Sequence, residues 1–330
     1  MTRRIALLVL TSYWSPVENL LATVDSRFDI FVHVDLKSHF AADELSLADH
    51  VHVLSERVEV YWGGWSMVLA TLRLLRAAMS RASYERYVLV SGDSLPLLDS
   101  EALETCLLNR DTEYISAAPV SDDPLLAGAP VAESVRRYRS EHPWRFQNHV
   151  FWDNILLNPM GRGACMARYG IGGPMADVLR NDAQQAIEGI AGALPPRPAL
   201  FKSLHVGAQW WALSAEAIEL IREDLFATEL ERFFRFFAVP DEHVFSCLIG
   251  NRLDALRDRG RRIIGTMMWT NHRARAQGRW TLAAEELAVV RRQHGPQLLF
   301  ARKFDPQAAP DVADAIRNGR YAQDILHLKT

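Results

Sequence analysis

The chain has 330 residues, 49% of them apolar, and a formal net charge of −3, so it can bury a large core. The small acidic excess argues against a general nucleic-acid binder, whose surface carries a basic excess. No stretch approaches the ~18 uninterrupted apolar residues of a transmembrane helix. These features favour an α/β enzyme without a membrane span, which leaves room for peripheral membrane association only.

The first 120 residues alternate between strand and helix signals. Apolar runs typical of buried parallel strands predict strands at 5–10, 30–34, 51–54, 87–90 and 113–116. Helices are predicted at 15–24, opened by Ser15 and Pro16, at 67–79, and at 101–108, capped by Asp99 or Ser100. This order predicts a Rossmann-like, mostly parallel sheet flanked by helices. Ligands bind such sheets beyond the carboxyl ends of the strands, where Asp35 and Asp93 stand.

Residues 120–205 are rich in Pro, Gly, Arg and aromatic residues, with one clear helical segment, Met175–Ile190. So long an irregular insertion is usually functional or disordered, and its aromatic content argues against disorder. We interpret it as a region that covers an acceptor. Tryptophan rings suit sugars as flat platforms, although most tryptophans are core residues. The candidate acceptor-binding side chains are Gln209, Trp210, Arg137 and Trp144.

From residue 205 the pattern becomes regular again. It predicts strands at 206–213, 263–267 and 298–300, and helices at 215–225, capped by Ser214, and at 241–248, opened by Pro240. No repeat, low-complexity tract or linker marks a second domain. We therefore expect a single domain over 1–330, with a nucleotide-binding half at 1–120, the insertion at 120–205, and a catalytic and diphosphate-binding half at 205–330.

The cysteines indicate the compartment. Cys106, Cys165 and Cys247 are far apart and form no Cys-x-x-Cys pair, which favours reduced thiols in a cytosol. The apolar run Ile5–Leu10 follows two arginines as in a secretory signal. Because it spans only six residues and no small-residue cleavage site follows, we interpret it as a strand. The expected location is cytoplasmic.

The segment Val239-Pro240-Asp241-Glu242-His243 has two interpretations. Proline followed by two acids is ordinary chemistry at a helix start, because the helix dipole favours anions there. The functional interpretation is a general base, in which one carboxylate takes the proton from an attacking hydroxyl. His243 is a competing base, although a structural or orienting role is favoured for it.

The segment Leu298–Phe304 is an apolar run with Arg302 and Lys303 near its end. Successive strand side chains point to opposite faces, so at least one of these cations faces solvent or a site. Cations fixed on a rigid strand suit a diphosphate, although a basic pair at a strand exit needs no ligand. The loop 270–279 supplies further basic candidates, namely Arg273, Arg275 and Arg279.

Six segments, in order along the chain, resemble the family of core-2/I-branching β-1,6-N-acetylglucosaminyltransferases and peptide O-xylosyltransferases. They are Phe31-Val32-His33-Val34-Asp35-Leu36-Lys37-Ser38, Trp62-Gly63-Gly64-Trp65-Ser66-Met67-Val68, Tyr87-Val88-Leu89-Val90-Ser91-Gly92-Asp93-Ser94-Leu95-Pro96, Gly207-Ala208-Gln209-Trp210-Trp211-Ala212-Leu213-Ser214, Pro240-Asp241-Glu242-His243 and Phe300-Ala301-Arg302-Lys303-Phe304.

The resemblance implies an inverting GT-A transferase that moves a sugar, N-acetylglucosamine or xylose, from a UDP-sugar to a glycan or glycolipid hydroxyl without a metal or other cofactor. It implies that Glu242 is the base. It implies diphosphate contacts from the Arg302-Lys303 pair, above all Lys303, and from an arginine of the 270–279 loop. The implied uridine contacts are Asp35 and Trp62, and Asp93 is a further nucleotide-binding candidate.

The absence of certain motifs indicates whether the protein binds a divalent metal ion. The chain has no Asp-x-Asp pair, through which nucleotide-sugar transferases of this architecture commonly hold a divalent cation. Its two Asp-x-Glu triplets, Asp99–Glu101 and Asp111–Glu113, fit a helix cap and a strand entrance. A leaving diphosphate then needs positive side chains instead. There is also no P-loop and no dinucleotide fingerprint.

The chain departs from the animal enzymes of this family. It lacks their membrane anchor, their many lumenal cysteines and their acceptor-region residues, which fits a bacterial, cytosolic enzyme of surface-polysaccharide biosynthesis. Two alternatives stay open at this point: a metal-dependent nucleotide-sugar transferase, and a glycan-binding module without catalysis.

Overall fold

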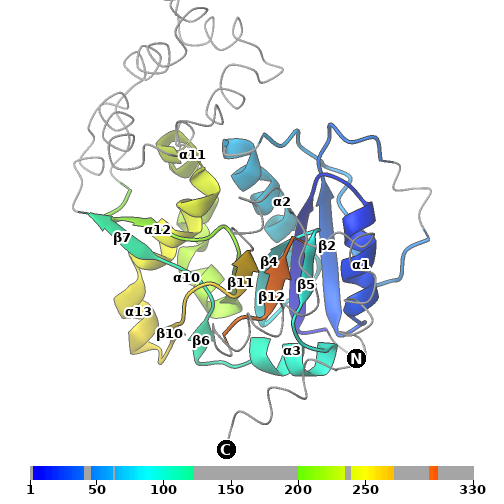
Figure 1. Cartoon of the computed structure of the whole chain (residues 1–330). Helices are drawn as coiled ribbons and strands as arrows, with labels where there is room; N and C mark the ends of the chain where they lie inside the picture. The colour runs from blue at the N-terminus through cyan, green and yellow to red at the C-terminus, as the bar shows by residue number, and fades with distance from the viewer. Residues whose placement is uncertain are drawn as a thin grey trace, which may run out of the picture.

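The computed structural model describes residues 3–40, 46–61, 64–121, 200–234, 239–270 and 297–303. In its first half, strands and helices alternate as the sequence predicts (Figure 1). The strands are β1 (Ile5–Thr11), β2 (Phe28–Val34), β3 (Val51–Val53), β4 (Arg86–Ser91), β5 (Ser94–Pro96), β6 (Thr112–Glu113) and β7 (Ala118–Ser121). The helices are α1 (Ser15–Thr23), α2 (Trp65–Arg81) and α3 (Ser100–Leu107).

The second half combines short strands with helices. Its strands are β8 (Leu204–Val206), β9 (Trp211–Ser214), β10 (Arg262–Ile263), β11 (Met268–Thr270) and β12 (Phe300–Arg302). Its helices are α10 (Ala215–Leu225), α11 (Thr228–Phe234), the 3-10 turn η3 (Pro240–Glu242), α12 (Val244–Gly250) and α13 (Leu253–Asp258). Most of the insertion at 120–205 lies outside the described residues, so the division of the chain into parts stays a prediction.

The main sheet has five strands in the order β3-β2-β1-β4-β9. β1 pairs in parallel with both β2 and β4, and β9 closes the edge in antiparallel pairing with β4. The chain therefore moves outward from β1 to β3 and then returns across the sheet to β4. Because such crossovers are right-handed, α1 and α2 are placed on opposite faces. The mostly parallel α/β sheet is thus confirmed, with its switch point between β1 and β4 (Figure 1).

The core explains why the strand predictions succeed. Every residue of β2 and β4 is buried, and β1 is buried from Ile5 to Val9, so these strands read as continuous apolar runs. Two predicted caps are also present. The Asp99 side chain accepts a hydrogen bond from the Ala102 N–H at 2.9 Å, and the Ser214 hydroxyl accepts one from the Ala217 N–H at 3.1 Å.

Four predicted elements differ from the structure. The strand expected at 263–267 is replaced by two short strands, β10 and β11, with residues 264–267 between them. The strand expected at 206–213 is divided into β8 and β9 at Gly207, where a Cβ would lie 1.8 Å from the Ser116 carbonyl oxygen, so the backbones meet too closely for a regular ladder. The helix expected at 241–248 starts with the separate turn η3 before α12. The strand expected at 113–116 contributes only β6, which pairs with β10 outside the main sheet.

A second, three-stranded sheet lies against the carboxyl end of β4. Its order is β11-β12-β5, with β12 parallel to β11 and antiparallel to β5. β5 follows β4 after a tight turn, so β12 is anchored beside the switch point. Because this sheet joins segments from residues 94 and 302, no local signal predicts it.

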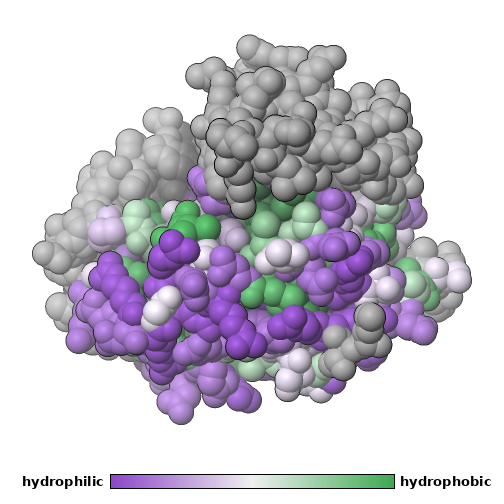
Figure 2. Space-filling view, turned by 90° about the horizontal axis from the view of Figure 1, so that it is seen from below, coloured by the Kyte–Doolittle hydropathy of each residue, from purple (hydrophilic) through white to green (hydrophobic). Residues whose placement is uncertain are grey.

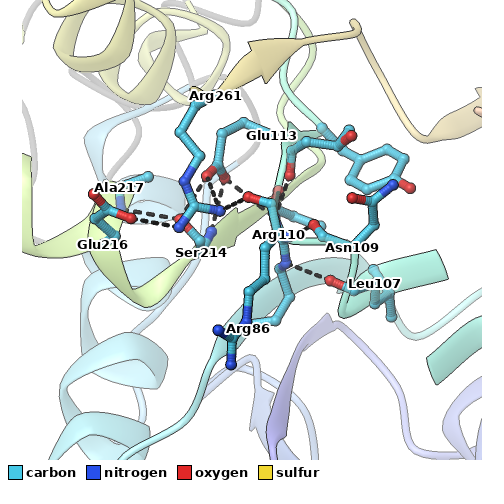
Figure 3. Close-up of polar contacts among 12 residues, drawn as sticks. Arg86, Leu107, Asn109, Arg110, Glu113, Ser214, Glu216, Ala217 and Arg261 are labelled. Atoms are coloured by element: carbon cyan, nitrogen blue, oxygen red, sulfur yellow. Dashed lines mark hydrogen bonds and ion pairs between the residues drawn. The ribbon is translucent and has the colours of Figure 1, made fainter. Parts of the chain in front are cut away.

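A buried ion pair lies at the amino end of β4, at the opposite end of that strand from the second sheet (Figure 3). Arg86 Nη1 lies 3.2 Å from Glu113 Oε2, and the two side chains are 2% and 0% exposed. The guanidinium also donates to the main-chain carbonyls of Leu107, Asn109 and Thr112 at 2.6, 2.7 and 2.8 Å. Ser214 donates to the Glu113 carboxylate through its N–H at 2.8 Å and through its hydroxyl. Both buried charges are thus hydrogen-bonded, as burial requires.

The surface seen from the side of α3, β6 and β10 is mostly hydrophilic (Figure 2).

The buried pair generates a stability prediction. Replacing Glu113→Gln leaves Arg86 charged and buried without its counter-ion, so we expect the free energy of unfolding to fall by about 3 kcal/mol. Urea unfolding followed by circular dichroism measures it. The matched control is Glu219→Gln, which removes the carboxylate of an exposed pair with Arg222 and should change stability by less than ~0.5 kcal/mol. Equal effects of the two variants would contradict the assignment.

Candidate functional site

The end of β1 forms the floor of the candidate site. Gly92 donates its N–H to the Leu10 carbonyl at 2.8 Å, and Asp35 donates its N–H to the Thr11 carbonyl at 2.9 Å. A Cβ on Gly92 would lie 2.6 Å from Thr11 Oγ1, so only glycine lets the turn after β4 approach β1 this closely. Asp35 and Asp93 are thereby held on either side of the end of β1. This is the edge where open α/β sheets bind ligands.

Asp93 pairs with Arg302, one of the two basic residues predicted to bind the diphosphate. Its carboxylate lies 3.2 Å from Arg302 Nε through Oδ1 and 3.5 Å from Arg302 Nη2 through Oδ2. The hydroxyl of Ser91 donates to the same carboxylate. The guanidinium also lies over the Trp210 ring, 4.6 Å from its centroid. Three predicted site residues from distant parts of the sequence therefore form one cluster.

Asp35 is buried, and the protein itself binds its carboxylate. Lys37 Nζ lies 2.8 Å from Oδ2, while the main-chain N–H groups of Lys37 and Val60 donate to Oδ1 at 3.0 and 3.2 Å. The Lys37 ammonium also lies 4.3 Å from the centre of the Tyr61 ring. Asp35 thus fixes the segment that leads to Trp62, which itself lies outside the described residues. Its predicted contact with uridine stays a prediction.

Glu242 lies on η3 and is half-buried. Its carbonyl accepts a hydrogen bond from the Gly207 N–H at 2.9 Å, so the end of β8 holds the turn in place. Val239, just before η3, has φ 51° and ψ 55°, a left-handed conformation that costs a β-branched residue free energy. Such strain persists only where surrounding structure imposes it, and here it lies three residues before the candidate base.

His243 has a structural environment. It is fully buried, and its Nδ1 lies 3.0 Å from the His205 carbonyl oxygen. A ring nitrogen at this distance from a carbonyl donates its proton. The hydrogen bond ties the start of α12 to β8. The residue that follows β8, Gly207, bonds to the Glu242 carbonyl. These contacts favour the orienting role over the role of competing base.

The segment 207–210 connects the two groups of candidates. Its first residue, Gly207, donates to the Glu242 carbonyl, and its last, Trp210, lies under the Arg302 guanidinium. Between them, Gln209 is 8% exposed, and its Nε2 has no hydrogen-bond partner among the described residues. A buried amide donor without a partner is costly. It therefore suits a ligand oxygen, in keeping with the predicted acceptor-binding role.

The remaining predicted residues divide into two groups. Lys303 directly follows β12 and is half-buried. The others lie outside the described residues and stay predictions; they are Trp62, Arg137, Trp144, Arg273, Arg275 and Arg279. The described part of the chain contains no group of three or more His, Cys, Asp or Glu side chains that could hold a metal ion.

The sequence pattern does not single out His33, which lies on β2 two residues before Asp35. It is fully buried, and its Nε2 accepts a hydrogen bond from the Val58 N–H at 2.9 Å. Burial disfavours the charged ring and lowers the pKa of His33 to about 4, only partly offset by the nearby Asp35 charge. At neutral pH the ring is therefore an uncharged acceptor that holds the segment at Val58.

This histidine predicts a pH dependence of stability. Its pKa is about 4 in the folded protein and 6.5 for an unperturbed ring, so its stabilising contribution is complete above pH 6.5 and is lost as pH falls towards 4. We expect the wild type to lose about 2 kcal/mol more unfolding free energy between pH 7 and pH 5 than His33→Gln, whose amide oxygen keeps the acceptor. Urea titrations at both pH values measure the difference, and equal losses would refute it.

Comparison with known proteins agrees with the motifs. Residues 11–123 match the family model described as Core-2/I-Branching enzyme. No match is found among curated proteins. Within the described residues, no helix is both long and apolar enough to cross a membrane. The family match starts at the last residue of β1 and runs through β7, so it includes the Asp35 and Asp93 segments. It confirms over this part of the chain the resemblance to the Core-2/I-branching family of glycosyltransferases that the sequence motifs indicated.

Proposed function

We propose that this protein is an inverting glycosyltransferase of the GT-A type, which moves N-acetylglucosamine or xylose from a UDP-sugar to a hydroxyl of a glycan or glycolipid in the cytoplasm. The family match over residues 11–123 supports transfer of a sugar. The strand order, with its switch point between β1 and β4, supports a nucleotide at the carboxyl edge of the sheet.

One observation carries the proposal. The segment 207–210 contacts the candidate base at one end and the Asp93–Arg302 cluster at the other. A transferase needs a proton acceptor and a phosphate-binding cation on the two sides of one reacting carbon. Holding both on a rigid frame supplies the proximity and orientation that lower the barrier.

In the proposed reaction, the Glu242 carboxylate accepts the proton of the acceptor hydroxyl. The hydroxyl oxygen forms a bond to the anomeric carbon from the face opposite UDP, while the bond from that carbon to the UDP oxygen breaks and its electron pair leaves with the diphosphate. Lys303 and an arginine of the 270–279 loop stabilise the charge that develops on the diphosphate. Configuration at the anomeric carbon is inverted because one displacement occurs.

The base is tested by Glu242→Gln. The amide has the same shape but cannot accept the proton, so we expect kcat to fall at least ~100-fold while the Kd for UDP changes little. Release of UDP from a UDP-sugar with acceptor present measures kcat, and calorimetry measures Kd. Glu219→Gln on α10 is the matched control and should keep wild-type turnover. Unchanged turnover in Glu242→Gln would exclude this residue as the base.

Metal dependence separates the proposal from its main rival. Because a guanidinium already occupies the Asp93 carboxylate, we expect turnover to be the same in EDTA and in Mn²⁺. A strong loss in EDTA that Mn²⁺ restores would show a metal-dependent transferase instead. A glycan-binding module without catalysis would give no turnover with any UDP-sugar.

A further inference from the structure

We infer that Arg302 is a positioning residue that fixes the strand end carrying Lys303, and not a ligand of the diphosphate. The inference rests on the proposed function, because it concerns how that site holds its phosphate-binding lysine. It replaces the diphosphate role that the sequence suggests for Arg302.

The first step is the geometry of the pair. Arg302 Nε and Nη2 face the two carboxylate oxygens of Asp93 at 3.2 and 3.5 Å. Two nearly parallel contacts between a planar guanidinium and a carboxylate fix orientation as well as distance. One of the two edges through which a guanidinium can bind an oxyanion is therefore already used by the protein.

The second step is the face of the guanidinium. Arg302 Cζ lies 4.6 Å from the centre of the Trp210 ring, and Trp210 is 7% exposed. A planar cation stacked on an aromatic ring has lost much of its freedom to turn. The Arg302 side chain is itself only 17% exposed. One edge and one face are thus committed to neighbours within the protein.

The third step is the strand that these contacts hold. Arg302 is the last residue of β12 and pairs with Ser94 of β5, directly after Asp93. The hydroxyls of Ser91 and Ser94 lie 2.8 Å apart, and Ser91 donates to Asp93. The end of β12 is therefore fixed to the turn after β4 by main-chain and side-chain contacts together. Lys303, the next residue, leaves the sheet from this fixed point.

Charge supports the same conclusion. A paired carboxylate and guanidinium have no net charge, so the Asp93–Arg302 pair adds little to the positive field that a diphosphate experiences. Lys303, the next residue along the chain, is the cation to which the proposed function gives the diphosphate. The pair supplies geometry, and the lysine supplies charge.

The test is a double-mutant cycle on the affinity for UDP, with Asp93→Asn, Arg302→Met and the double variant. If the pair positions Lys303, either single change should weaken UDP binding about tenfold. The double variant should be no weaker than Arg302→Met, because the same interaction is lost. If Arg302 instead contacts the diphosphate, Asp93→Asn should leave UDP binding unchanged or tighter, and that result would overturn the inference.

Two further variants make the result specific. Arg302→Lys keeps the charge but loses the planar fork, so it should bind UDP as weakly as Arg302→Met; wild-type affinity in this variant would also overturn the inference. Arg222→Met on α10 removes an arginine from the exposed pair with Glu219 and should not alter UDP affinity.

Calorimetry at a temperature well below each thermal midpoint excludes loss of folding as the cause. If Arg302→Met does not fold, unchanged or tighter UDP binding by Asp93→Asn alone still overturns the inference. Failure of the wild type to bind UDP would count against the proposed function itself. Wild-type UDP binding with no effect of Asp93→Asn would remove only the inference about Arg302.

Discussion

The contact between Asp93 and Arg302 joins residues that are 209 positions apart in the sequence, and it connects the three-stranded sheet to the carboxyl edge of the main sheet. It fixes β12 to the turn after β4 and places Trp210 beneath the guanidinium. Main-chain pairing with β5 and β11 and the burial of Phe300 and Ala301 hold the rest of β12. Short strands of this length gain their stability from what they pack against.

The two ends of the main sheet each carry an arginine–carboxylate pair, and their burial separates their roles. Arg86 and Glu113 are buried and have main-chain partners as well, so their pair belongs to the core. Asp93 and Arg302 are 24% and 17% exposed, next to Lys303. A buried pair that is fully hydrogen-bonded has nothing left for a ligand. A partly exposed pair can order a site, because it restricts movement without sealing the surface.

Much of the first half could be predicted from the sequence, and the reason is local. β1, β2 and β4 are buried along most or all of their length, so their apolar runs carry the signal themselves. The division at Gly207 could not be predicted, because it depends on how closely Ser116 approaches from a distant segment. The same limit applies to the site. Asp93 and Arg302 were both identified as candidates, but their pairing depends on the antiparallel register of β12 and β5, which no neighbouring residue encodes.

In a site built in this way, one set of residues holds the backbone rigid and another set carries the proposed chemistry. The left-handed Val239, the hydrogen bond from Gly207 to Glu242, and the stacking of Arg302 on Trp210 each fix a backbone next to a reactive group. The proposed acid–base and phosphate-binding groups, Glu242 and Lys303, each directly neighbour such a fixed point. Rigid support of this kind is organised on folding, so little ordering is left for the moment when substrate binds. A guanidinium on Asp93 fits this scheme, since its position is set by the fold, whereas a metal ion would have to be bound from solution.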